Sequence, residues 1–89
     1  MAEAFHPSVF ISDELEARGW SKEMLAIAMT GDIDRNILML DLYMEVGPER
    51  PNMRIGKTLS KKLSHAFGTS QQFWLNLEAE WLKRAERMG

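Results

Sequence analysis

Apolar side chains return every three or four residues in five segments of this chain, which is the spacing of one face of a helix. The expected helices cover about residues 7–18, 22–29, 35–45, 57–67 and 71–87. Gly19 and Gly31 end the first two, and a stretch rich in glycine and proline follows the third. The pattern predicts an all-α fold of five helices around one core. The length of 89 residues predicts a single domain over residues 1–89.

The join between the fourth and fifth expected helices carries the clearest local signals. Gly68 suits the left-handed position that closes a helix, because glycine has no Cβ to clash there. Ser70 suits the N-cap of the next helix, where its hydroxyl accepts a backbone N–H. The N-caps expected for the second and third helices are Ser21 and Asp34. The apolar positions expected after Ser70 are Phe73, Trp74, Leu77 and Trp81.

The third expected helix is apolar on nearly all sides. Its expected core positions are Leu38 and Leu42, with Ile33 before them. The surplus apolar side chains are Ile37, Met39, Leu40, Tyr43 and Met44. A helix of this kind does not lie free on a surface. Two explanations stay open: the surplus side chains form a dimer or partner interface, where methionine and aromatic residues are enriched, or the helix is simply more buried.

Composition sets the expected class and compartment of the protein. The chain has no cysteine, so it has no disulfide framework and no thiolate site, which fits a reducing cytosol. It has no apolar run of the length that a membrane span needs, and its N-terminus lacks the pattern of a signal peptide. We therefore expect a cytoplasmic globular protein with no membrane association.

The net charge is −2 and the sequence pI is about 5.6, whereas DNA-binding domains generally show a basic footprint. Acidic residues dominate the first half of the chain, from Glu3 to Asp41. Basic residues gather in one later region: Arg50, Arg54, Lys57, Lys61 and Lys62. This group predicts either an edge that contacts phosphates or a solvated helix face.

The sequence shows no constellation for catalysis or metal binding. His6 and His65 are far apart and have no cysteine or acidic companions at ligand spacing. The acidic pairs Glu14/Glu16 and Glu78/Glu80 are two residues apart, so their side chains diverge on a helix. No nucleophile elbow and no glycine-rich phosphate loop occurs. We expect a protein that is not an enzyme and that needs no metal or cofactor.

Several short motifs occur in a fixed order along the chain. His6-Pro7-Ser8 precedes the first helix, Gly19-Trp20-Ser21-Lys22 joins the first to the second, and Leu25-Ala26 lies in the second. The segment from Phe67 to Glu78 reads Phe-Gly-Thr-Ser-Gln-Gln-Phe-Trp-Leu-Asn-Leu-Glu. Over about residues 6–81, these motifs resemble the antidote proteins of bacterial plasmid-maintenance (HigA-like) systems. Those proteins belong to the phage-repressor-like (Xre/Cro) helix-turn-helix superfamily.

The resemblance implies a helix-turn-helix unit over about residues 21–46, whose third helix enters the major groove of double-stranded DNA. Arg35 and Asn36 would contact base edges, since arginine and asparagine can each grip a base with two hydrogen bonds. The residues that would hold phosphates are Lys22, Arg54 and Lys57. The resemblance also implies a homodimer, with Trp74 and Trp81 divided between the core and the dimer seam; the alternative is a purely monomeric core.

The third helix departs from the family pattern, which places small polar and basic residues on the face that reads DNA. Here the helix is largely apolar, and Asp34 and Asp41 would repel phosphates. Two functional hypotheses follow. The chain is a DNA-binding transcriptional regulator that resembles an antitoxin, or it is a protein-interaction module on the same scaffold that has lost DNA binding. In the second case its partner is a toxin, another protein or a second copy, held by Met39, Leu40, Tyr43 and Met44.

Overall fold

A computed structural model describes residues 5–50 and 52–88, with side chains as far as residue 84. Its five α-helices are α1 (Pro7–Arg18), α2 (Lys22–Ala28), α3 (Ile33–Asp41), α4 (Gly56–Phe67) and α5 (Gln71–Met88). One π-helical turn, η1 (Leu42–Val46), extends α3, and a 3-10 turn, η2 (Gly47–Glu49), follows it. No strand occurs in the described ranges. The predicted all-α class with five helices is confirmed.

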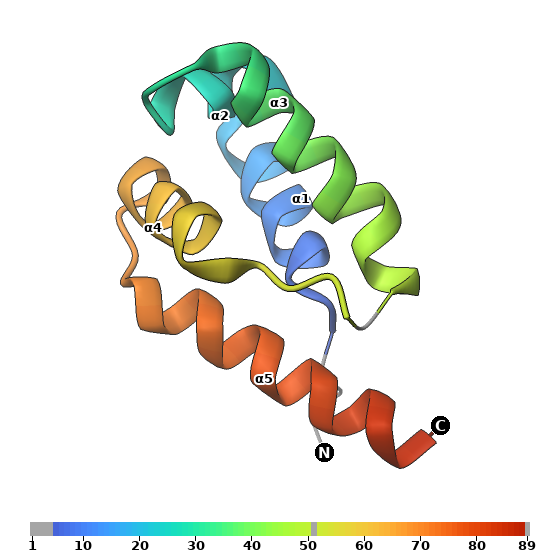
Figure 1. Cartoon of the computed structure of the whole chain (residues 1–89). Helices are drawn as coiled ribbons and strands as arrows, with labels where there is room; N and C mark the ends of the chain where they lie inside the picture. Colours follow the sequence, from blue (N-terminus) through green and yellow to red (C-terminus); the bar gives the residue numbers. More distant parts are fainter. Residues whose placement is uncertain (1–4, 51, 89) are drawn as a thin grey trace.

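The five helices pack around one core, with α4 in contact with both α5 and α2. In Figure 1, α5 (red) runs along the side of the molecule opposite α2, and α4 lies between them. Helix α5 packs on α4 and α1, whereas α2 packs on α3 and α4. The shared core contains Ile11, Leu25, Met29, Leu40, Tyr43, Ile55, Leu59, Leu63, Phe67 and Trp74.

Polar side chains cap the helix starts, as the sequence predicts in most cases. The Ser21 hydroxyl accepts a hydrogen bond from the Met24 N–H at 3.2 Å, and the Ser70 hydroxyl accepts one from the Phe73 N–H at 3.1 Å. The third cap was predicted wrongly: Asp32, rather than Asp34, accepts from the Arg35 N–H at 3.1 Å. Helix α3 therefore begins at Ile33, two residues before the expected start.

The buried face of α3 is opposite to the predicted one. Leu40 is fully buried and Tyr43 is 2% exposed, whereas the expected core residues Leu38 and Leu42 are 59% and 46% exposed. Ile33 is 43% exposed. The reason is Asn36, which is buried one turn before Leu40 and fixes this face against α2.

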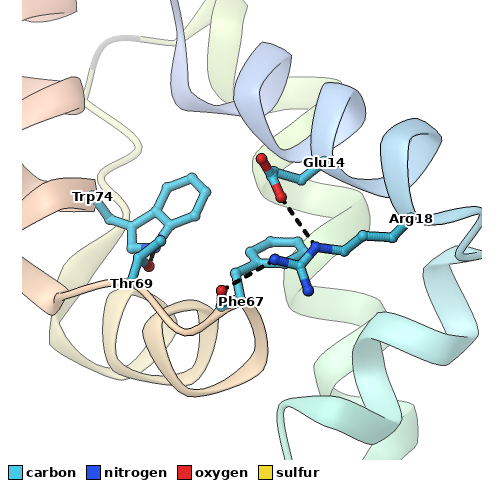
Figure 2. Close-up of polar contacts among 5 residues, drawn as sticks. All are labelled: Glu14, Arg18, Phe67, Thr69 and Trp74. Atoms are coloured by element: carbon cyan, nitrogen blue, oxygen red, sulfur yellow. Dashed lines mark hydrogen bonds and ion pairs between the residues drawn. The ribbon is translucent and has the colours of Figure 1, made fainter.

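Arg18 ties the end of α1 to the end of α4. Its guanidinium donates to a Glu14 carboxylate oxygen at 3.0 Å and to the Phe67 carbonyl oxygen at 3.1 Å (Figure 2). The same group lies 5.1 Å from the ring centroids of Trp20 and Phe67, which is cation–π distance. Arg18 is therefore occupied within the fold.

A second polar cluster joins the start of α1 to η1 and α5. The Glu78 carboxylate, 6% exposed, accepts from the Tyr43 hydroxyl at 2.6 Å and from the Ile55 N–H at 2.7 Å. His6 lies beside it, with its ring centroid 4.7 Å from those of Tyr43 and Trp81. Its Nδ1 accepts from the Ser8 N–H, while its buried Nε2 has no hydrogen-bond partner. Burial lowers the pKa of His6 to about 4, so the ring is neutral at pH 7.

Candidate nucleic-acid and protein interface

The turn between α2 and α3 is held by a buried amide. Thr30 and Gly31 both have a left-handed backbone, with φ of 64° and 86°. The Asn36 side-chain N–H₂ donates to the Ala26 carbonyl at 2.9 Å and to the Thr30 carbonyl at 2.7 Å. Asn36 is 1% exposed. The prediction that Asn36 contacts bases is therefore wrong, because its two donors already bind the backbone of α2 and of the turn.

Lys22 is also engaged inside the fold. Its ammonium lies 2.5 Å from an Asp41 carboxylate oxygen and 3.9 Å from a Glu45 carboxylate oxygen. The hydrogen bond to Asp41 raises the pKa of Lys22, so the ammonium keeps its charge at neutral pH. The predicted phosphate contact of Lys22 stays a prediction, and two acidic side chains of α3 and η1 would compete with a phosphate for this ammonium.

Arg35 remains the one predicted base-contacting residue that the structure places on the surface. It lies in the first turn of α3 and is exposed. Within the described residues it takes part in no ion pair. Its neighbours on the outward side of α3 are the exposed Asp34 and Leu38. Arg35 is therefore accessible, but its surroundings are acidic and apolar.

Arg54 and Lys57 lie together at the start of α4, and both are exposed, as their predicted role requires. They begin a basic surface that continues along α4. We call this the α4 basic face, and it consists of Arg54, Lys57, Thr58, Lys61, Lys62 and His65. Residues 50–77 contain five lysines and arginines and no acidic residue, whereas residues 1–49 contain ten acidic and three basic residues. Charge is therefore strongly separated along the chain.

A groove of about 350 Å³ lies between this face and the turn after α2. Four of its lining residues, Thr58, Lys61, Lys62 and His65, share one side of α4 at i, i+3, i+4, i+7 spacing. The Lys62 ammonium donates to the Thr30 carbonyl at 3.0 Å. The parts played by Thr58 and His65 were missed from the sequence, although the helical spacing was a signal for them.

The predicted interface residues are mostly core. Leu40 and Trp74 are fully buried, and Tyr43 is 2% exposed, so none of the three is accessible to a partner. The Trp74 indole N–H donates to the Thr69 hydroxyl at 2.7 Å (Figure 2). Met39 and Met44 are half-buried against the same core, and Trp81 packs edge-on against His6. The interface prediction is therefore wrong for Leu40, Tyr43 and Trp74, which belong to the core of their own chain, and stays a prediction for Met39, Met44 and Trp81.

Different apolar residues are exposed instead. On α3 and η1 they are Ile33, Leu38 and Leu42, and on α2 they are Met24 and Ile27, which are 51% and 60% exposed. A second groove, of about 300 Å³, lies between α3 and the start of α4. Its apolar lining includes Met39, Leu42, Met53 and Leu59, and Arg54 and Lys57 also line it. An accessible apolar surface is thus present on the outward side of α3.

The described residues contain no group of three or more histidine, cysteine or acidic side chains placed to hold a metal ion. Among the same residues, no helix has both the length and the apolar character that crossing a membrane requires. Comparisons of the chain with known protein families, with curated proteins and with solved structures found no match.

Proposed function

We propose that this chain is a helix-turn-helix DNA-binding regulator that resembles an antitoxin, with α2, the turn and α3 as the helix-turn-helix unit. The observation that carries the proposal is the α4 basic face, which lies beside that unit. Lys57 and Lys61 are exposed and form no ion pair within the described residues. A surface of this kind attracts a polyanion, because neutralising phosphates releases the counterions condensed on the duplex.

The mechanism divides between two surfaces. The α4 basic face contacts phosphates and sets the position of the protein on the duplex, without reading sequence. Arg35 supplies the base contact, as a donor of two hydrogen bonds to guanine in the major groove. Asn36 acts indirectly, since it fixes the turn that orients α3. Affinity in this scheme comes mainly from phosphates, and sequence preference is modest.

The test is the salt dependence of binding to a short mixed-sequence duplex, measured by fluorescence anisotropy. Neutralising three phosphates gives a slope of about −3 in a plot of log affinity against log salt. The double variant Lys57→Gln/Lys61→Gln should reduce the magnitude of that slope by about 2. Lys83→Gln is the control, because Lys83 lies on α5 beside Glu80, 3.7 Å away, and should leave the slope unchanged.

Two results would count against the proposal. One is no detectable binding at low salt. The other is binding whose salt slope is the same for the double variant and for the original chain. A reduced affinity of Arg35→Ala, by about 1–3 kcal/mol on a preferred sequence, would assign the base contact to that residue.

A specific observation favours a second candidate function, a protein-interaction module that does not bind DNA. The side of α3 that would enter the major groove carries exposed Leu38 and Leu42 with Asp34, which suits a protein partner better than phosphates. The partner is then a toxin, another protein or a second copy of the chain. Light scattering of the original chain and of Leu38→Lys tests this function, because a protein interface on α3 would be weakened in the variant, whereas a regulator that dimerises through another helix would assemble as before.

A further inference from the structure

The outward side of α3 and η1 carries an apolar stripe with an acidic residue at each end. We define the outer stripe as Asp34, Leu38, Leu42 and Glu45, which recur at about helical spacing. Leu38 is 59% exposed and Leu42 46% exposed, and the Glu45 side chain is 71% exposed. Exposed leucines in neighbouring turns form an apolar ridge, and here acidic side chains flank that ridge at both ends.

The groove between α3 and α4 has the complementary character. Its apolar lining comes from Met39, Met53 and Leu59, and its cations are Arg54 and Lys57. Leu42 belongs both to the outer stripe and to the lining of this groove, so the stripe and the groove share a border. One molecule therefore presents an acid-flanked apolar ridge next to a groove with an apolar lining and basic residues.

We propose that the outer stripe and the α3–α4 groove together bind a second copy of this chain. In a two-fold arrangement the same patch serves both partners, so each stripe enters the groove of the other copy. The leucines of one copy cover the apolar lining in its partner, and the acidic residues of the stripe face the cations of the groove. Charge complementarity within one patch is the argument for self-association over an unrelated partner.

The inference deepens the second candidate function by naming the partner, and it does not depend on DNA binding. It has a consequence if the chain does bind DNA. The dimer covers Lys57 and Arg54, which belong to the α4 basic face, and it covers the side of α3 next to Arg35. Self-association and DNA binding then compete, so rising protein concentration lowers the fraction of chains free to bind the duplex.

The first experiment is sedimentation equilibrium of the chain without DNA, over a range of concentrations that spans the micromolar region. We expect a monomer–dimer equilibrium there. Leu42→Ser should weaken association by at least about tenfold, because a two-fold interface loses both copies of the side chain. Val9→Ser is the matched control: Val9 is an apolar residue of similar exposure, 41%, on α1 and outside the patch, so association should be unchanged. Circular dichroism checks that each variant is folded.

The second experiment is a charge exchange between Glu45 and Lys57. Glu45→Lys and Lys57→Glu should each weaken self-association several-fold, because each places like charges across the interface. In a heterodimer of the two variants, the stripe changed to lysine faces the groove changed to glutamate. At the second contact of the same heterodimer, the unchanged stripe of the Lys57→Glu copy faces the unchanged groove of the Glu45→Lys copy. Opposite charges therefore face each other at both contacts. Association of the mixture should therefore return close to that of the original chain.

Three outcomes would overturn the proposal: an original chain that stays monomeric, a Leu42→Ser variant that dimerises as tightly as the original, or a mixture no tighter than its components. Unchanged dimerisation of Leu42→Ser would place the dimer interface on another surface. If the chain stays monomeric and an unrelated protein binds the patch, that protein is the partner instead. DNA binding of the original chain and of Lys57→Gln/Lys61→Gln is measured at protein concentrations too low for dimers to form. The DNA proposal therefore stands or fails separately.

Discussion

The corner between α4 and α5 and the corner between α2 and α3 both use a left-handed backbone, but different contacts hold them. At the first corner, Gly68, Ser70 and the Thr69–Trp74 hydrogen bond all lie within a few residues of one another. At the second corner, Asn36 reaches the end of α2 and Lys62 reaches the turn from α4. The first corner is held mainly by residues of its own sequence, with one added contact from Arg18 of α1 to the Phe67 carbonyl, whereas the second corner depends on side chains of α3 and α4.

The largest expected effect on the free energy of unfolding is a difference between substitutions on the buried and on the exposed side of α3. Leu40→Lys should unfold the chain or cost about 4 kcal/mol or more of unfolding free energy, because a charge would replace a fully buried side chain. Leu38→Lys, on a side chain that is 59% exposed, should stay within about 0.5 kcal/mol of the original. Urea unfolding followed by circular dichroism measures both. Equal losses in the two variants would contradict the assignment of the two faces.

The next effect concerns the cluster that joins α1 to η1 and α5. The unfolded chain takes up a proton on His6 near pH 6.5, whereas the folded chain does so near pH 4. The folded state therefore loses stability as pH falls from 6.5 towards 4, by up to about 3 kcal/mol, and gains nothing further from His6 above that range. Unfolding measured across this window should show the loss in the original chain and in His65→Asn. His6→Asn should lack it; a persistent loss there would assign the pH dependence to another group.

A smaller effect is expected at the α2–α3 corner itself. Asn36→Ala removes both donors of the buried amide and should cost about 2 kcal/mol of unfolding free energy. The control is Asn76→Ala on α5, because the exposed Asn76 side chain contacts only Gln72 among the described residues. Its change should be within about 0.5 kcal/mol. Similar values for the two variants would mean that the amide does not hold the corner.

The smallest effect is expected at the α4–α5 corner. Ser70→Ala removes the N-cap of α5 and should cost about 1 kcal/mol. Ser64→Ala is a matched change inside α4, where the serine hydroxyl donates to the Lys61 carbonyl of its own helix and to no other described residue. That variant should be neutral or slightly stabilised, since alanine has the higher helix propensity. Thermal unfolding of both variants measures the difference. An equal stability of Ser70→Ala and Ser64→Ala would mean that the cap does not stabilise the corner.

The elements with local signals were predictable from the sequence, and the contacts between elements were not. The helix count, the caps at Ser21 and Ser70 and the left-handed Gly68 follow from single residues and their near neighbours. The buried face of α3 does not, because nearly every side of the helix is apolar and hydrophobicity cannot choose among them. Asn36 makes the choice through two hydrogen bonds to carbonyls whose position depends on the packed α2.

The candidate site divides in the same way. Arg35, Arg54 and Lys57 are all exposed, which agrees with a role in binding. The ion pairs of Lys22 were not predicted, because its carboxylate partners, Asp41 and Glu45, lie about twenty residues later in the sequence. Long-range polar contacts of this kind leave no periodic trace in a sequence. Hydrophobic spacing therefore identified the helices, but not which polar groups remain accessible.

Acidic residues are concentrated in the first half of the chain and basic residues between residues 50 and 77, so the net charge of −2 conceals two segments of opposite charge. A pI of about 5.6 describes only the sum of these charges. At neutral pH and low salt, such a chain should adsorb to an anion exchanger by one side and to immobilised heparin by the other. Binding to both supports would show that the chain uses a different surface for each, whereas the acidic isoelectric point alone predicts binding to the anion exchanger only.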